Sequence, residues 1–544
     1  MVESKNTARK SFLSGVLLLS LSTVLVKIVG FVYKIPMLSY LGSVGMGYFH
    51  SAYEIYAMFC VIATAGLPVA LSLLISAALA REDHFRVRRL FQTGIRIFFA
   101  AGLLGSAVMI ALAPAFCRMM RSKNAYDCIL AIAPTVFFIC LSSAYRGYFQ
   151  GYQRMMPTAI SQLIEAVGKL VFGLLFAHVA LQRGMEPPKI AAAAGWGLTF
   201  GTAFSVLYLV VEKVRFDKHQ RQALRTGEQA HPSVFSPILR PLAKLAVPMT
   251  FGAGAVSLTK LIDMTMILRR LRSIGFSEVA ANEVYGSYAT LALSIYSLLP
   301  SLVGMIALPL IPILSSAIEV GDRERQRSMI RASYHLTTML AIPASLGVSA
   351  FARPILSLLF GRNVEAVEQA APLLSMLGVS IFLSCMIAAS NSVLHAYRSV
   401  NRPILSMLAG AAVKVVSAYF LIGIPSIGIL GAPISTFACN LTVVALNLFF
   451  AARLQRIDDL IVVFGKPLAA SVPAVGIPFC LYQLFLMRFG ESLLLSVGAL
   501  SMVVVLYVLF ACLLGVITAE DLESFPMGKK IIGFFMKIHL LYAD

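Results

Sequence analysis

The chain has 544 residues, of which 59% are hydrophobic and only 13% are charged, and its mean hydropathy is +0.84. A soluble globular protein needs more polar surface than this composition supplies, so the sequence predicts a polytopic membrane protein. The net charge of +20 raises the alternative of a nucleic-acid partner, which the placement of the charges can decide.

The first apolar stretch runs from Ser11 to about Ile35. It lacks a signal-peptide cleavage pattern, so we expect it to stay in the protein as a first span. In the second apolar stretch Gly66 and Pro68 predict a kink, because a proline frees a backbone carbonyl and bends a helix. Such a kink can serve as a hinge between moving parts.

Later spans follow from runs without charged residues, since a helix needs roughly 20 apolar residues to cross the hydrocarbon core. These runs are Ile97–Cys117, Ile190–Val211, Val284–Ile318, Ala332–Ala352, Gln369–Tyr397, Val415–Ala452, Pro467–Met487 and Ser492–Ala519. The run Val415–Ala452 is expected to form two spans, because its segment IGIPSIGILGAP is typical of a tight turn. The prediction is an all-α membrane protein with about 14 transmembrane helices.

The basic residues indicate how the chain is oriented. With the N-terminus in the cytoplasm, 29 of the 45 Lys and Arg residues fall in inner loops, 11 in outer loops and five within spans. Arg146 and Arg154 are counted among the inner-loop residues. Cytoplasmic loops carry such an excess, so both termini are expected in the cytoplasm. The surplus of basic residues is therefore a topology signal, and no nucleic-acid partner is predicted.

Features of the first half recur in the second. Lys27 on the first span matches Lys260 on the first span beyond a polar linker, and an offset of 245 relates Lys169 to Lys414. Six spans return a chain to the same side, so the halves are expected to be parallel, pseudo-symmetric repeats. The predicted parts are an N-terminal lobe (1–212), a cytoplasmic linker (213–240), a C-terminal lobe (241–452), two added helices (453–519) and an amphipathic tail on the cytoplasmic surface (520–544).

Charged residues within the predicted spans are the candidate functional groups. They are Lys27, Lys34, Lys169, Lys260 and Lys414 on the basic side, and Glu54, Glu165 and Asp263 on the acidic side. An ionised group at the bilayer centre costs about 2.5–3.5 kcal/mol, so these side chains are expected to face a cavity between the lobes. The excess of two positive charges, with Arg269 and Arg270 expected at the outer mouth, suits an anion.

Simpler explanations stay open for individual residues. Glu165 precedes Lys169 by four positions and Asp263 follows Lys260 by three, so each pair can neutralise itself on its own helix. Lys34 can instead extend its ammonium group to the nearest membrane interface. Self-pairing does not account for the whole set, because the lysines outnumber the acids.

Several segments resemble a known family. The stretch LAIAPTVFFICLSSAYRGYFQGYQRMMPTAISQLIEAVGKL closely resembles the fourth and fifth spans of the SpoVB-like polysaccharide exporters. KIVGFVYKIPMLSYLGSVGMGYF and AGLPVALSLLISAALARED resemble the first and second spans. These exporters are relatives of the MurJ lipid II flippases in the multidrug/oligosaccharidyl-lipid/polysaccharide (MOP) superfamily. The resemblance implies two six-helix lobes, a groove for a polyprenyl tail formed by two added helices, and alternating access.

The resemblance also implies a function. In the family, basic residues of the first span meet the pyrophosphate; these are usually Arg, and here they are Lys27 and Lys34, which lack bidentate geometry. We therefore expect a bacterial cell-membrane flippase for an undecaprenyl-pyrophosphate-linked glycan of wall or spore synthesis, without enzymatic activity or a cofactor. The expected substrate-binding residues are Lys27, Lys34, Lys260, Lys414, Arg269 and Arg270, and the expected coupling or ion-pairing residues are Glu54, Asp263, Glu165 and Lys169.

Two other functions are the alternatives. A MATE-type multidrug or cation antiporter belongs to the same superfamily, but organic cations call for an acidic cavity. A membrane-embedded polyprenyl-phosphate glycosyltransferase usually needs metal-binding carboxylates. The adjacent acids occur only in short basic loops or the tail, at Glu82-Asp83, Asp458-Asp459 and Glu520-Asp521. The eight cysteines are scattered singly, without zinc spacing, so no metal site is predicted.

Overall fold

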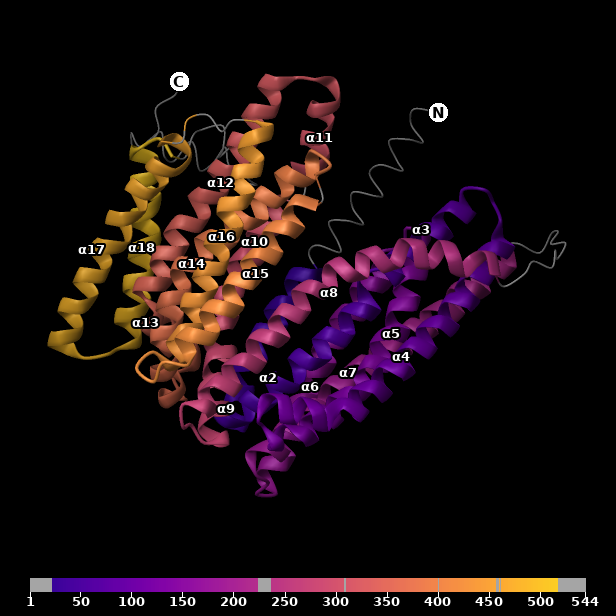
Figure 1. The fold of residues 1–544 in the computed structure, drawn as a ribbon, viewed down its shortest axis with the longest axis horizontal. Coiled ribbons are helices and arrows are strands. Elements are labelled where there is room, and N and C mark those ends of the chain that lie inside the picture. Colours follow the sequence, from indigo (N-terminus) through magenta and orange to yellow (C-terminus); the bar gives the residue numbers. More distant parts are fainter. Residues whose placement is uncertain are drawn as a thin grey trace. The chain divides into compact units, whose positions relative to one another are not determined.

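The computed structural model describes residues 22–223, 236–307, 310–399, 401–455, 459 and 461–516, and every regular element in these ranges is a helix. The prediction of an all-α fold is confirmed. Contacts divide the chain into two compact units, Met1–Gly286 and Ser287–Asp544. Figure 1 colours the first unit from indigo to magenta and the second from magenta through orange to yellow. The predicted tail, 520–544, lies outside the described residues.

The first unit is built around α5. A helical segment at Ser22–Val32 precedes α2 (Lys34–Thr64), α3 (Leu67–Leu79), α4 (His84–Met120), η1 (Lys123–Ala125), α5 (Tyr126–Gly151), α6 (Met156–Gln182), α7 (Pro187–Ala223), α8 (Ser236–Ser273) and α9 (Glu278–Ser287). Helix α5 packs against α2, α3, α4 and α7, and α6 lies along α7. The division between the units falls at Gly286 because α8 packs on α2, α3 and α4.

Two backbone breaks shape the start of this unit. Gly42 adopts φ 62° and ψ 175°, a conformation that glycine accepts readily, and it interrupts the helical geometry of α2. Ala65 and Gly66 separate α2 from α3, and Pro68 lies in the first turn of α3. The kink predicted from Gly66 and Pro68 is confirmed.

The second unit is centred on α14. Its elements are η2 (Tyr288–Ala292), α10 (Leu293–Ala307), α11 (Leu310–Val320), α12 (Arg323–Ala350), α13 (Ala352–Phe360), α14 (Val364–Ala396), α15 (Asn401–Ile422), η3 (Gly428–Leu430), α16 (Gly431–Leu454), η4 (Ile461–Gly465), α17 (Lys466–Phe489) and α18 (Leu493–Leu513). Helix α14 packs against α10, α11, α12, α13 and α16, while α17 pairs with α18 and rests on α12. The two spans predicted within Val415–Ala452 are present as α15 and α16.

Ten helices in the described ranges are long and apolar enough to cross a membrane, or up to twelve if each of two bent pairs is one span. The bent pairs are Ser22–Val32 with Lys34–Val61, at 44°, and Arg323–Ala350 with Ala352–Phe360, at 78°. The predicted count of about 14 is higher. Part of the difference is α3, which has 13 residues and is too short to cross alone. The first 21 residues, where the first predicted span begins, lie outside the described ranges.

Glycines bring α6 and α7 into backbone contact. A Cβ atom at Gly197 would lie 2.2 Å from the backbone nitrogen of Gly173, and one at Gly201 would lie 2.5 Å from that of Lys169. Both distances are too short for any side chain. The two glycines form the segment GLTFG on α7, and small residues at this spacing let membrane helices approach closely. The same contact fixes the backbone that carries Lys169.

The glycine contact predicts an effect on stability. Replacing Gly201 by Leu should push α7 away from α6 and lower the melting temperature of the purified protein in detergent. The loss should reach the upper end of the ~1–3 kcal/mol typical of over-packing, because backbone atoms must move. Gly498→Leu is the matched control, since a Cβ atom there meets nothing within 4 Å. Equal melting temperatures for the two variants would contradict this account of the contact.

Candidate functional site

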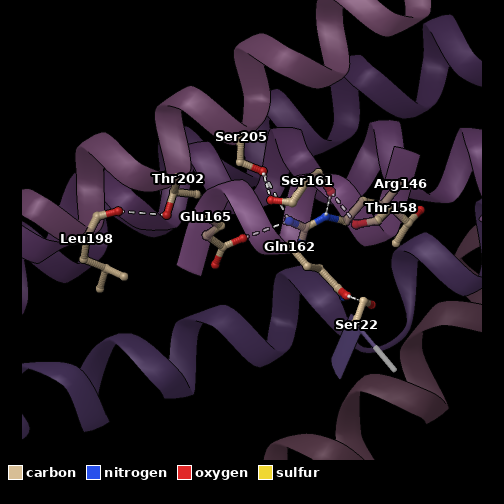
Figure 2. A network of polar contacts seen from close by, with 9 residues as sticks. All are labelled: Ser22, Arg146, Thr158, Ser161, Gln162, Glu165, Leu198, Thr202 and Ser205. Carbon is tan, nitrogen blue, oxygen red and sulfur yellow. Dashed lines mark hydrogen bonds and ion pairs between the residues drawn. The ribbon is translucent and has the colours of Figure 1, made fainter. Parts of the chain in front are cut away.

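An ion pair between Arg146 and Glu165 lies inside the first unit (Figure 2). Arg146 Nη2 is 2.8 Å from Glu165 Oε2, and the two side chains are only 11% and 22% exposed. Arg146 also donates from Nε to Ser161 Oγ at 2.9 Å and from Nη2 to Ser205 Oγ at 3.3 Å. The guanidinium group therefore joins α5 to both α6 and α7.

The surrounding helices hold this ion pair in place through serine hydroxyls. Ser161 and Glu165 are four residues apart on α6 and so share one face, toward which Arg146 extends from α5. Ser205 Oγ donates to the carbonyl of Ser161, and Ser161 Oγ donates to that of Thr158. These bonds, drawn in Figure 2, satisfy hydroxyl groups that are buried.

The ion pair corrects two interpretations of the sequence. Arg146 was expected in an inner loop, but it lies on α5, which continues as far as Gly151. Lys169, on the same helix, was one possible partner for Glu165, but Glu165 forms its ion pair with Arg146. A guanidinium group can bind a carboxylate and neighbouring hydroxyls at once through its planar fork, which a lysine ammonium group cannot do. With Arg146 added to the charged residues of the predicted spans, the basic excess rises from two to three.

Lys169 forms part of a different group of charges. Its Nζ lies 4.8 Å from the centre of the Tyr53 ring, which places the ammonium group over the aromatic face. Lys34 is within electrostatic range of Lys169, Lys260 and Glu54. Lys27 is within range of Lys260. The structure thus gathers four predicted lysines in the first unit, together with the carboxylate of Glu54.

Other predicted residues lie at the edge of this group. Lys27 and Lys260 are exposed, whereas Asp263 is half-buried on α8. Arg269 is exposed and Arg270 is half-buried near the C-terminal end of α8. Cations there interact favourably with the helix dipole, which is a structural role sufficient to explain their position.

Two further titratable residues lie within the helices, His50 in the first unit and Lys414 in the second. Sequence reasoning missed His50, which is 7% exposed on α2 and within electrostatic range of Lys34 and Lys169. A single histidine in an apolar helix carries no pattern that distinguishes it. Lys414 lies on α15 in the second unit and is half-buried, within electrostatic range of Tyr296.

Tyr296 belongs to a polar network of the second unit. Its hydroxyl is hydrogen-bonded to Ser384 Oγ, and Asn440 Nδ2 donates to both hydroxyls, at 2.8 Å to the tyrosine and 2.9 Å to the serine. The network joins α10, α14 and α16. No sequence motif identified these residues, because they are far apart in the chain and each alone is an ordinary polar residue of a membrane helix.

A cavity of about 450 Å³ opens beside the Arg146–Glu165 ion pair, within the first unit. Its wall comes from the Ser22–Val32 segment, α2, α5, α6 and α8, and it includes Tyr33, Tyr53, Tyr56, Cys60, Arg146, Gln162, Glu165 and Lys169. In the described ranges, no group of three or more His, Cys, Asp or Glu side chains is placed to hold a metal ion. The side chains named in its wall are charged, amide, aromatic and thiol groups.

Comparison with models of known protein families shows to which family the chain belongs. A family model described as "Polysaccharide biosynthesis protein" matches residues 12–318, more than half of the chain, and one described as "MatE" matches residues 248–420. The chain belongs to the polysaccharide biosynthesis protein family. Stage V sporulation protein B of Bacillus subtilis (strain 168) is 25% identical over 83% of this chain and 85% of its own length. Lipid II flippase MurJ of the same organism is 24% identical over 82% of each chain.

Solved structures show the fold of this family member. Lipid II flippase MurJ in an inward closed conformation aligns with a TM-score of 0.68 at 14% identity, covering 91% of this chain and 98% of the other. An inward-facing MATE family multidrug transporter aligns with a TM-score of 0.63 at 13% identity, covering 82% and 100%. The predicted MurJ- and MATE-like fold is confirmed, and the chain is a multi-pass membrane transporter of the MOP superfamily.

The ion pair predicts strong coupling between its members. Arg146→Gln or Glu165→Gln alone should destabilise the protein by about 3–5 kcal/mol, because each leaves a buried charge without its partner. The double variant should recover at least half of the loss. A double-mutant cycle by chemical denaturation in detergent measures the coupling. Arg398→Gln, in an exposed pair with Glu319, is the control, with an expected loss below about 1 kcal/mol. Additive losses at Arg146 and Glu165 would contradict the prediction.

Proposed function

We propose that this transporter is a flippase that moves an undecaprenyl-pyrophosphate-linked glycan, either lipid II or another polysaccharide precursor, from the inner to the outer leaflet of a bacterial cell membrane. Alternating access with both termini in the cytoplasm is part of the proposal. The observation that carries it is the group of lysines in the first unit. Similarity to Stage V sporulation protein B and to a lipid II flippase supports the class of substrate.

The lysine group favours a multiply charged anion. Lys34 lies within electrostatic range of two ammonium groups, on Lys169 and Lys260, but of one carboxylate, on Glu54. Repulsion among ammonium groups is poorly screened in an apolar environment, so an anion with two or more charges would stabilise the arrangement more than a single carboxylate does. A pyrophosphate diester supplies such charge, and lysine binds phosphate as a point charge.

The other charged residues take supporting roles in this proposal. Lys27, Lys414, Arg269 and Arg270 would contact the anion along its path, while Glu54 and Asp263 would organise the lysines or carry a coupling proton. Glu165 would act indirectly, because its carboxylate already pairs with Arg146. Its part is to hold α5 and α6 together beside Lys169.

A cation antiporter fits these charges less well. The cavity wall of the first unit includes one carboxylate, on Glu165, and the adjacent Arg146 offsets its charge. Lys169 adds a further positive charge to the same wall. An organic cation would be repelled there. A glycosyltransferase is also disfavoured, because the solved structures that share this fold are transporters.

Removing two lysine charges should impair transport. In vesicles containing the full chain and fluorescent lipid II, Lys34→Gln combined with Lys169→Gln should slow flipping by about 100-fold or more, because each of the two charge-assisted contacts contributes about 1.5–3 kcal/mol. Arginine at both positions should preserve most of the rate, since the charge is retained. The measurement is the rate at which the labelled headgroup becomes accessible to a quencher outside the vesicles.

Lys189→Gln is the control for that experiment, because Lys189 is exposed in the first turn of α7. It should flip lipid II at the rate of the unmodified protein. An unchanged rate in the double lysine variant would contradict the anion-binding role of the lysines. Proton-driven uptake of ethidium without lipid II flipping would identify a cation antiporter instead.

A further inference from the structure

The cavity beside Arg146 combines an aromatic side with a polar side. Tyr53 and Tyr56 from α2 contribute rings whose centres are 5.6 Å apart at an angle of 51°. Gln162, Glu165 and Lys169 contribute polar groups from a single face of α6, as their spacing of three and four residues requires. The cavity is thus bounded by aromatic rings, an amide, a carboxylate and an ammonium group.

This combination suits a sugar better than a free anion. The C–H groups of a pyranose ring stack on the negative face of an aromatic ring, and its hydroxyl groups bond to planar amide and carboxylate groups. The guanidinium group of Arg146 is already bonded to Ser161, Glu165 and Ser205, so it is not available as a dedicated anion site. The volume of about 450 Å³ falls within the ~300–1,000 Å³ of ligand pockets.

Lys169 connects the cavity to the lysine group. It lines the cavity, lies over the Tyr53 ring and is within electrostatic range of Lys34. A pyrophosphate held by Lys34 and Lys169 would therefore bring the sugar attached to it to the cavity entrance. In a lipid-linked glycan that sugar is bonded directly to the pyrophosphate, so the two subsites must adjoin.

We propose that the cavity lined by Tyr53, Gln162 and Glu165 is a subsite for the sugar next to the pyrophosphate. This proposal rests on the proposed flippase function and adds a site that distinguishes a glycan-bearing lipid from its sugar-free form. The sugar packs against the Tyr53 and Tyr56 side of the cavity, next to the ammonium group that lies over Tyr53, and bonds to Gln162 and to the exposed part of the Glu165 side chain, 22% of it. Selection by headgroup then takes place inside the first unit.

The test compares two probes on the full chain in nanodiscs. One is undecaprenyl pyrophosphate, and the other is undecaprenyl pyrophosphate carrying one N-acetylglucosamine. The unmodified protein should bind the sugar-bearing probe about tenfold more tightly, since a site built for hydroxyl groups discriminates against a ligand that lacks them. Tyr53→Leu and Gln162→Leu should each reduce the ratio of the two affinities toward one. The change in this ratio between a variant and the unmodified protein isolates the sugar, because the extra charge of the sugar-free pyrophosphate and any displacement of Lys169 do not depend on contacts with the sugar.

Tyr40→Leu is the matched control on α2, since Tyr40 packs near His178 and does not line the cavity. It should keep the ratio of the unmodified protein. If Tyr53→Leu and Gln162→Leu also keep that ratio, or if the unmodified protein binds both probes equally, the cavity holds only water and the subsite is refuted while the flippase function stands. Failure to bind either probe would refute the flippase function and the subsite together.

Cys60 provides a direct test of occupancy. Its side chain is half-buried in the cavity wall, and the other cysteines that are not buried are Cys439 and Cys480. In a variant with serine at those two positions, alkylation of Cys60 by a small maleimide should be slowed severalfold by the sugar-bearing probe and not by undecaprenyl pyrophosphate. Equal protection by the two probes, or protection by neither, would refute entry of the sugar into the cavity.

Discussion

The first unit depends on a buried ion pair that links three helices. A charged group within a bilayer is stable only where another group neutralises and hydrogen-bonds it. Arg146 meets that condition through Glu165 and the hydroxyls of Ser161 and Ser205. Because these partners lie on α6 and α7, the pair fixes both helices relative to α5. The cavity owes its polar wall to the same face of α6 that carries Glu165 and Lys169.

Local patterns were enough to predict the fold class and several of its details. Apolar runs mark spans because every backbone polar group must be satisfied within a helix in lipid. The turn IGIPSIGILGAP separates α15 from α16, and the kink at Gly66 and Pro68 separates α2 from α3. These features are encoded in contiguous residues. The number of spans was harder to predict, because the sequence does not show where a span bends, as the chain does by 44° between Ser22–Val32 and Lys34–Val61.

The contacts of the site could not be predicted in the same way, because they join residues of different helices. The four-residue spacing of Glu165 and Lys169 is favourable on an isolated helix by only ~0.2–0.5 kcal/mol. A guanidinium group that binds the carboxylate and two serines outweighs that preference. Lys169 then lies over the ring of Tyr53, which is separated from it by more than a hundred positions in the chain. The enrichment in lysines within the predicted spans was visible in the sequence, whereas their partners were not.

Arginine and lysine have different roles in this unit, and their chemistry explains why. Arg146 presents a planar fork to fixed acceptors, which suits a contact that must persist while the protein works. The ammonium groups of Lys34 and Lys169 are carried on flexible chains, so under the proposed function an anion could move past them without losing all its contacts at once. A transporter must release its cargo as well as bind it. Under the proposed function, point charges that a moving phosphate can pass would meet this requirement better than a bidentate clamp.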